Sequence, residues 1–293
     1  MDMMDHEHIA GDMEGLAEQA PDLVPAPRPE LPVRRPLAVE VHGLSKRYDK
    51  FLAVDNISFA VPQGEFYGFL GPNGAGKSTT IRVLCGLLAG EYRSIHIAGH
   101  DLRGDSIGVK ASIGVMLEDP MLYERLSAPE HLEFTGMMYG LDRQTARERM
   151  AELISMLDLQ GAGNKLIVDF SQGMRKKVAL GCALIHEPRV LFLDEPFNGI
   201  DTVSSHQIKQ LLQRRVAQGV TIMFSSHVME VVEKLCTSLA IIHQGKIRLE
   251  ASMADLKSRP NWDGLESEFI RTVGHVAGME TDGPPENSDG KLA

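Results

Sequence analysis

Residues 71–79 read GPNGAGKST, and this stretch decides the fold of the chain. It fits the pattern G-x-x-x-x-G-K-[ST], in which glycines let backbone N–H groups turn inward around the phosphate oxygens of a nucleotide. The apolar residues 66–70 before it predict a buried strand, and residues 80–88 predict a helix whose N-terminus adds partial positive charge. The residues expected to bind the nucleotide here are Gly71, Pro72, Asn73, Gly74, Ala75, Gly76, Lys77, Ser78 and Thr79.

Two carboxylates farther along the chain narrow the class of protein. The phosphate loop alone is shared by kinases, GTPases and motors. Residues 190–193 predict a second buried strand, and Asp194 and Glu195 follow it directly. An Asp at a strand end beside the phosphate loop can hold Mg2+ through water, and the adjacent Glu can polarise an attacking water. In the loop itself, Lys77 can reach the terminal phosphates and Ser78 can hold Mg2+.

A third motif lies between these two, at residues 170–174, which read FSQGM and precede three basic residues and an apolar helical run. Ser171 is a good helix N-cap and Gly173 allows close approach of the backbone, so the segment alone would be read as an ordinary capped helix. Between the other two motifs, it resembles the signature sequence L-S-G-G-Q of ABC-type ATPases.

Three further elements of the ABC family follow in the order that the family has them. Tyr48 lies before the phosphate loop, where the family stacks an aromatic ring on adenine. Residues 198–201, ending at Asp201, resemble the loop that crosses the dimer interface. His227 follows an apolar strand at residues 221–224 and resembles the switch histidine that contacts the γ-phosphate. Taken singly, Tyr48 would be read as a half-buried aromatic residue and His227 as a histidine at a strand end.

The chain also departs from the family pattern. Glu118 stands where many members have a Gln that contacts Mg2+ and the attacking water. We expect Glu118 either to coordinate Mg2+ through water or to point away and cap its loop. Gln172 and Met174 replace a Gly and the Gln of the signature. Thr202 stands where a proline often follows the crossing loop, which alters only local stiffness.

The resemblance covers roughly residues 38–256, and residues 171–177 and 195–201 are most similar to ATPase subunits of bacterial ABC-2 type exporters. It implies ATP and Mg2+ as cofactors, hydrolysis of ATP to ADP and phosphate, and a separate membrane permease, with export as the direction. The chain is accordingly expected in the cytoplasm, held at the inner face of the cell membrane by the permease. The implied catalytic residues are Lys77, Glu195 and His227, and the implied metal ligands are Ser78, Asp194 and Glu118.

The resemblance further implies a partner copy of the chain. Ser171 and Gly173 are expected to contact the γ-phosphate that a second subunit binds. Each subunit would then have two incomplete halves of a site, and two subunits arranged head to tail would complete both. Because both halves are intact in this sequence, a homodimer is expected.

Two alternatives remain open. A soluble ABC ATPase acting on the ribosome or DNA usually has two ATPase domains in one chain or long coiled coils, and neither pattern is found in the sequence. A net charge of −10 over 293 residues also argues against a nucleic-acid-binding surface. A non-hydrolysing, ATP-dependent regulatory subunit would require that Glu118 and the altered signature have abolished activity, which the intact Glu195 and His227 disfavour.

Composition predicts the organisation of the chain. Residues 1–36 are acidic and rich in proline, which predicts a disordered tail. Residues 37–256 predict an α/β ABC ATPase domain, with a P-loop NTPase core on a parallel sheet, a small antiparallel β subdomain and an inserted helical subdomain at about residues 120–172. Residues 257–293 predict a partly disordered extension. The sequence has no long apolar run that would predict a membrane span, and its acidic start does not resemble a signal peptide.

Overall fold

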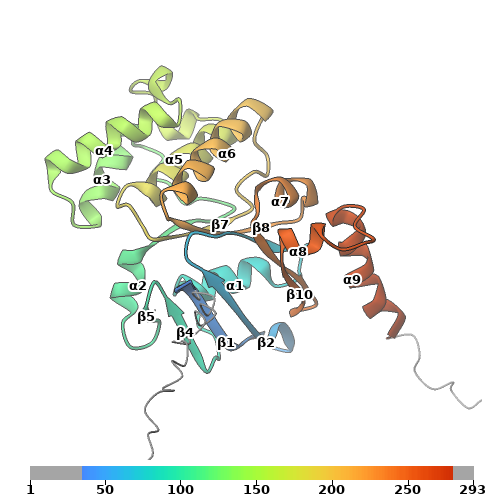
Figure 1. Ribbon diagram of the computed structural model, residues 1–293. Coiled ribbons are helices and arrows are strands. Elements are labelled where there is room, and N and C mark those ends of the chain that lie inside the picture. The colour runs from blue at the N-terminus through green and yellow to red at the C-terminus, as the bar shows by residue number, and fades with distance from the viewer. Residues whose placement is uncertain (1–34, 280–293) are drawn as a thin grey trace, which may run out of the picture. The chain divides into compact units, whose positions relative to one another are not determined.

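The computed structural model describes residues 35–279, which Figure 1 shows with labelled helices and strands. Four strands form an antiparallel sheet: β1 (Leu37–Tyr48), β2 (Phe51–Pro62), β4 (Ser94–Ile97) and β5 (His100–Asp101). The predicted antiparallel subdomain is present, in the order β2-β1-β4-β5. Its first two strands run beyond the predicted residues 37–41 and 57–61 because their pairing continues to a tight turn. Tyr48 therefore ends β1 opposite Phe51 and does not lie on a loop between strands.

The other six strands form the sheet on which the site is built. They are β3 (Phe66–Leu70), β6 (Ile113–Met116), β7 (Val190–Asp194), β8 (Thr221–Ser226), β9 (Ser238–His243) and β10 (Lys246–Ser252). The order is β10-β9-β3-β8-β7-β6, parallel except for β10 at one edge, so the predicted parallel core is confirmed. Leu70 pairs with Ser226 and Asp194 pairs with Ser225. The carboxyl ends of β3, β7 and β8 therefore meet at one edge, where open α/β sheets bind ligands.

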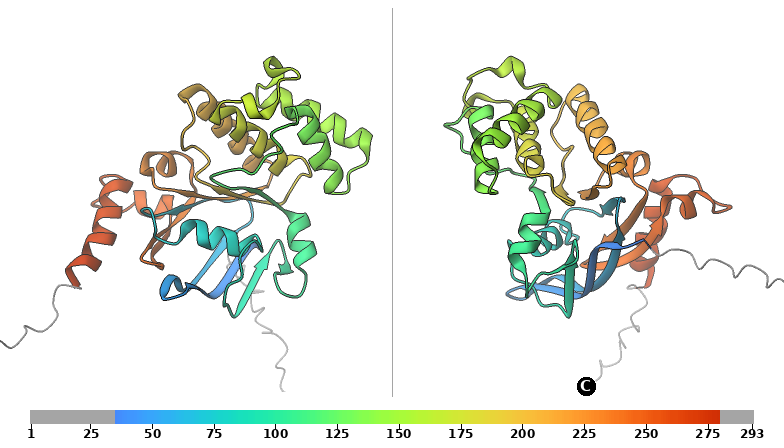
Figure 2. Two further views of the ribbon diagram at one scale, coloured as in Figure 1. Left: turned by 180° about the vertical axis from the view of Figure 1, so that it is seen from behind. Right: turned by 60° about the vertical axis from the view of Figure 1, so that its left-hand side comes forward.

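The central strands are continuous apolar runs because both faces of their sheet are covered. In β7, Leu191 and Leu193 face one hydrophobic core, whereas Val190 and Phe192 face the other. Figures 1 and 2 show α5 and α6 on one side of the sheet and α1 with the antiparallel strands on the other. Among the helices that contribute to these two cores are α1 (Lys77–Leu84), α2 (Ser106–Ser112), α5 (Gln172–Leu184), α6 (Thr202–Ala217) and α7 (Met229–Leu235).

Helices fill most of the segment between β6 and β7. Before α5 they comprise α3 (Ala128–Met138), α4 (Arg143–Met156) and two short 3-10 turns, Gln160–Ala162 and Ile167–Asp169. Ser127 begins α3 with a capping box, because its hydroxyl accepts from the backbone N–H of Glu130 and the Glu130 side chain accepts from that of Ser127. Asp142 caps α4 through its side chain, which accepts from the backbone N–H groups of Gln144 and Thr145. These two caps set where α3 and α4, the longer helices of this segment, begin.

The described part of the C-terminal extension is largely helical. It contains α9 (Leu265–Met279), which follows the short helix α8 (Met253–Lys257). Leu265 is buried, and Phe269 and Val273 pack against the same hydrophobic core. The four-residue spacing of these residues is a helical signal that the motif-based reading did not use. The predictions made for residues 1–34 and 280–293 concern positions outside the described part of the chain.

Candidate active site

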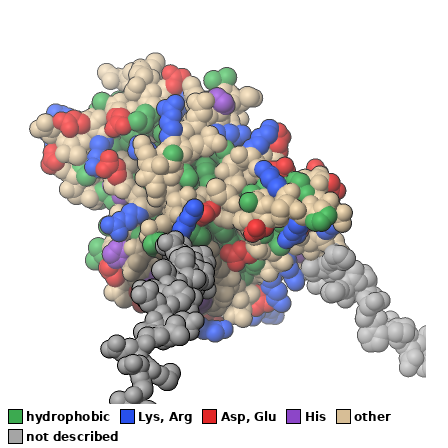
Figure 3. All heavy atoms as spheres, viewed as in Figure 1, with side chains coloured by type: hydrophobic (Ala, Val, Ile, Leu, Met, Phe, Trp, Pro, Cys, Tyr) green, Lys and Arg blue, Asp and Glu red, His purple; other side chains and the backbone are tan. Residues whose placement is uncertain are grey.

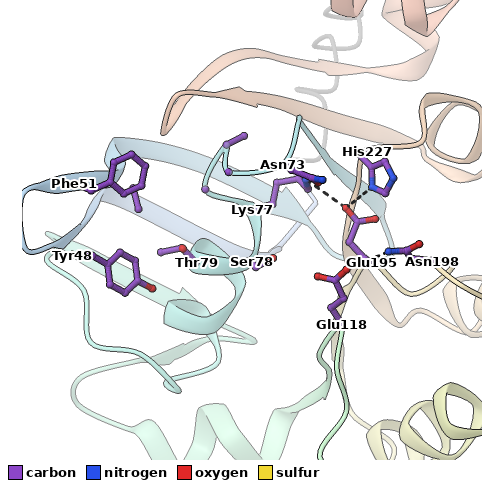
Figure 4. Close-up of a pocket in the computed structure, with 14 residues that line it drawn as sticks. Tyr48, Phe51, Asn73, Lys77, Ser78, Thr79, Glu118, Glu195, Asn198 and His227 are labelled. Carbon is purple, nitrogen blue, oxygen red and sulfur yellow. Dashed lines mark hydrogen bonds and ion pairs between the residues drawn. The ribbon is translucent and has the colours of Figure 1, made fainter. Parts of the chain in front are cut away.

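A pocket of about 440 Å³ opens at the carboxyl ends of β3, β7 and β8. Figure 4 shows that its walls come from the β1–β2 turn, the phosphate loop and the segments after β6, β7 and β8. The pocket therefore gathers residues that lie as far apart in sequence as Tyr48 and His227. Its lining residues are Tyr48, Phe51, Ala53, Asn73, Gly74, Ala75, Gly76, Lys77, Ser78, Thr79, Glu118, Glu195, Asn198 and His227.

The phosphate loop requires glycine at two places where the backbone is crowded. A Cβ added to Gly71 would lie 2.4 Å from the carbonyl oxygen of Ile242. Gly76 has a φ of +108°, and its Cβ would lie 2.6 Å from the carbonyl oxygen of Ala53. Helix α1 begins one residue later and ends at Leu84, earlier than the predicted residue 88, because Gly86 turns the chain with a φ of +67°. The loop thus presents its backbone to the pocket at the start of α1.

Lys77 is almost completely buried, with 6% of the residue exposed. Its ammonium donates hydrogen bonds to the carbonyl oxygens of Gly71 and Pro72, at 2.8 and 3.2 Å. The same nitrogen lies 3.4 Å from Oε1 of Glu195. A cation fixed in this way remains at the pocket wall, where it can meet phosphate charge without paying the entropy of ordering a free side chain.

Asp194 lies beneath the pocket and is fully buried. Its Oδ1 accepts hydrogen bonds from the hydroxyls of Ser78, at 3.0 Å, and Ser225, at 2.5 Å. Its Oδ2 is one of the buried polar atoms in the described chain that lack a hydrogen-bond partner. A buried carboxylate oxygen without a partner, beside a loop serine, fits a hydrated Mg2+ ion, which proteins usually hold through one or two side chains and substrate phosphates.

Glu195 follows Asp194 and has 6% of its surface exposed. Its φ of +46° is unusual for a residue with a side chain and turns the carboxylate into the pocket. Oε1 lies 3.0 Å from Nδ1 of His227 and 3.4 Å from Nζ of Lys77, and Figure 4 marks both contacts with dashed lines. The Glu195 N–H donates to the hydroxyl of Ser225, at 2.9 Å. Three segments of the chain therefore converge on one carboxylate.

Glu118 follows β6 and lines the same pocket. Its Oε1 accepts a hydrogen bond from Nδ2 of Asn198, at 3.2 Å. Figure 4 shows its carboxylate beside that of Glu195. Of the two expectations for Glu118, an outward-pointing cap does not describe this geometry, whereas contact with Mg2+ stays a prediction.

The mouth of the pocket carries two aromatic rings, of which only one was expected. Tyr48 and Phe51 are opposite each other across the β1–β2 turn and are 42% and 63% exposed. The ammonium of Lys46 lies 5.1 Å from the centre of the Tyr48 ring. Phe51 was missed because only the two-residue turn, which the sequence reading did not recognise, brings it beside the phosphate loop. An exposed aromatic pair suits stacking on a flat nucleobase.

Ser171, Gly173 and Asp201 do not line this pocket. Ser171 caps α5 by accepting a hydrogen bond from the N–H of Met174, and Asp201 caps α6 by accepting one from Ser204. A Cβ placed on Gly173 would lie 3.5 Å from Oδ2 of Asp201, so the two helix starts are close neighbours. The chain therefore brings the expected residues together in two groups rather than one.

The sheet order, the phosphate loop and the buried acids define a nucleotide-binding protein of the P-loop class. A protein-family model described as ABC transporter matches residues 54–198. The chain belongs to this family, and the relatives that it matches include proteins named as ATP-binding proteins of ABC transporters. The family predicted from the ordered motifs is thus confirmed.

Two relatives and one solved structure illustrate the match. The chain is 36% identical over 249 residues to the linearmycin resistance ATP-binding protein LnrL of Bacillus subtilis (strain 168), covering 81% of this chain and 80% of the relative. It is 36% identical over 240 residues to the daunorubicin/doxorubicin resistance ATP-binding protein DrrA of Streptomyces peucetius, covering 82% of this chain and 71% of the relative. A solved ATP-binding subunit of an ABC transporter superposes with a TM-score of 0.74 at 30% identity, covering 80% of this chain and 99% of that one.

Proposed function

We propose that this chain is the Mg2+-dependent ATPase subunit of an exporter whose substrate passes through a separate membrane permease. The observation that carries the proposal is the meeting of Lys77, Glu195 and His227 at one wall of the phosphate-loop pocket. Oε1 of Glu195 lies 3.4 Å from the ammonium and 3.0 Å from the imidazole. A carboxylate held at this position can orient an attacking water and accept its proton.

Each side chain has its own role in phosphoryl transfer. Lys77 neutralises charge on the terminal phosphates, and His227 contacts the γ-phosphate. Glu195 orients water and takes its proton as the new bond to phosphorus forms and the bond to the ADP oxygen breaks. Ser78, and Asp194 through water, would hold Mg2+, which spreads the phosphate charge. The products are ADP and inorganic phosphate.

A homodimer with two composite sites completes the proposal. The start of α5 at Ser171 and the start of α6 at Asp201 lie outside the pocket, as neighbours of each other. Their exposed capping residues are free to approach a nucleotide on a second copy of the chain. Head-to-tail pairing would bring each α5 N-terminus to the partner's γ-phosphate, where its partial positive charge is favourable. ATP would then stabilise the dimer, and hydrolysis would release it.

The helical subdomain offers a surface for the permease. Between residues 121 and 139 it exposes several large apolar side chains, in the region that follows Glu118. Exposed apolar groups gathered on one segment are typical of a protein–protein contact. The residues are Met121, Tyr123, Phe134, Met137, Met138 and Tyr139. The chain would be held at the inner face of the membrane by this contact. No helix within residues 35–279 is both long and apolar enough to cross a bilayer.

Export is favoured because the relatives LnrL and DrrA are named for resistance to linearmycin and to daunorubicin and doxorubicin. Action on DNA or the ribosome is disfavoured by the net charge of −10. Figure 3 shows acidic and basic side chains interspersed on the face that it presents, rather than a basic stripe that would follow a phosphate backbone.

Purification of the tagged chain from detergent-solubilised membranes tests the proposal. We expect a multi-span membrane protein to co-purify with it, and we expect Tyr123→Ser combined with Met138→Ser to reduce that recovery. Phosphate release by the purified variant should match that of the unmodified chain, because neither residue lines the pocket. Recovery of ribosomes or DNA in place of a membrane protein would contradict the proposal.

A further inference from the structure

Lys176 is a buried cation that the reaction described above does not use. It lies in the first turn and a half of α5, within the basic run of residues 175–177. Only 1% of the residue is exposed, although lysine is rarely buried unless its ammonium is satisfied by other groups. Its neighbour Lys177 is also buried, at 5% exposed. The two lysines differ in the groups that accept hydrogen bonds from their ammonium groups.

The Lys176 ammonium holds the turn that carries the catalytic carboxylate. It donates to the carbonyl oxygen of Glu195 at 2.8 Å and to that of Asn198 at 2.6 Å. These two residues already form one turn, since the N–H of Asn198 donates to the carbonyl of Glu195 at 3.2 Å. Lys176 therefore closes the turn from the side of α5, at the residue whose φ is +46°.

Through Asn198, Lys176 is also connected to Glu118, the other carboxylate that lines the pocket. Asn198 uses its side-chain amide to donate to Oε1 of Glu118, at 3.2 Å. Burial lowers the pKa of Lys176, while the nearby charges of Glu118 and Glu195 oppose that effect. By contrast, Lys177 donates to the side chain of Gln207 on α6, at 2.9 Å, and touches neither pocket acid.

We infer that Lys176 is a positioning residue for ATP hydrolysis, which aims the Glu195 carboxylate by holding the Glu195 and Asn198 carbonyl oxygens from α5. The inference rests on the proposed function. Because Ser171 begins the same helix, Lys176 is also the direct link between the helix start that faces a partner's nucleotide and the chain's own water-activating acid. The ammonium takes no proton in the reaction; its effect reaches the water only through Glu195.

Lys176→Met removes the donor and the charge while keeping a long side chain, and Lys177→Met is the matched control in the same helix. We expect Lys176→Met to lower kcat by about 10- to 100-fold, as misplacement of a reacting group does, with little change in the KM for ATP. Lys177→Met should stay within a few-fold of the unmodified chain. Lys176→Gln, which keeps N–H donors on a shorter side chain, should recover part of the loss and serves in place of Lys176→Met if that variant does not fold.

A double-mutant cycle separates positioning from general destabilisation. If Lys176 acts through Glu195, adding Lys176→Met to Glu195→Gln should cost little further activity. An equal fold-loss in both backgrounds, or a folded Lys176 variant with the kcat of the unmodified chain, would overturn the inference while leaving the ATPase proposal intact. Absence of turnover by the unmodified chain would overturn the proposed function itself, and this inference with it.

Discussion

Glu195→Gln should bind ATP but fail to hydrolyse it. The amide has almost the size of the carboxylate but cannot accept a proton from water, so we expect kcat to fall by about 10²–10⁴-fold. That loss corresponds to about 3–5 kcal/mol of transition-state stabilisation. The loop glycines and Lys77 are unchanged, and Lys77 keeps its hydrogen bonds to Gly71 and Pro72. ATP affinity should therefore stay within a few-fold of the unmodified chain.

The structure also indicates the effect on stability. Glu195 is 6% exposed and pairs with the buried Lys77, so neutralising it weakens a buried ion pair. Because Gln still offers an oxygen to Lys77 and His227, we expect a loss of about 1–3 kcal/mol rather than the larger cost of an unpaired buried charge. A folded variant is thus expected, and its thermal unfolding should be recorded first.

Three measurements read out this variant: phosphate release, titration with ATP, and size-exclusion chromatography with and without ATP. Glu118→Gln makes the same chemical change in the same pocket and is the matched control, which should remain active. Dimers of Glu195→Gln should accumulate when ATP is added. Phosphate release close to that of the unmodified chain would refute the role of Glu195, and a variant that binds ATP yet stays monomeric would count against the trapped dimer.

Three further predictions follow from the site and its surroundings. Ser171→Arg should impair hydrolysis while its own phosphate loop still binds ATP, and mixing it with Lys77→Ala should restore some activity in heterodimers; mixed dimers without any activity would contradict head-to-tail pairing. Glu118→Gln should change the dependence of the ATPase rate on free Mg2+, because one anionic charge leaves the ion's surroundings, and superimposable curves would remove its metal contact. Burial lowers the pKa of His186, which stacks on Tyr139, so its contribution to stability is present above the unfolded-state pKa of about 6.5 and is lost as the pH falls through the lower folded-state value. Phenylalanine cannot be protonated, so in His186→Phe the melting temperature should fall less below that pH than in the unmodified chain. Identical curves of melting temperature against pH for the two proteins would show that the ring is not desolvated.

The parallel core was predictable because its strands are continuous apolar runs that end in chemically distinctive residues. Phe66–Leu70 leads into the phosphate loop and Val190–Asp194 ends in a carboxylate, so their order along the chain predicted which groups would share an edge of the sheet. Local signals therefore sufficed where the strand and its functional residue are adjacent in sequence.

Contacts between distant segments were not predictable in the same way. Lys176 belongs to a run of three basic residues, which by itself does not indicate burial, yet packing of α5 against the turn after β7 buries its ammonium. Phe51 reaches the pocket only because a two-residue turn pairs it with Tyr48. Helix α9 was missed although Leu265, Phe269 and Val273 repeat at helical spacing. Each depends on tertiary packing or on a signal outside the motifs.

Release of inorganic phosphate from ATP by the purified chain, measured with Mg2+ and beside Lys77→Ala, tests the central claim most directly. The unmodified chain should turn over ATP, and the variant should lose nearly all activity and bind ATP more weakly, because a fixed cation has been removed from the phosphates. Equal steady-state rates for the two proteins would contradict the claim that this pocket hydrolyses ATP.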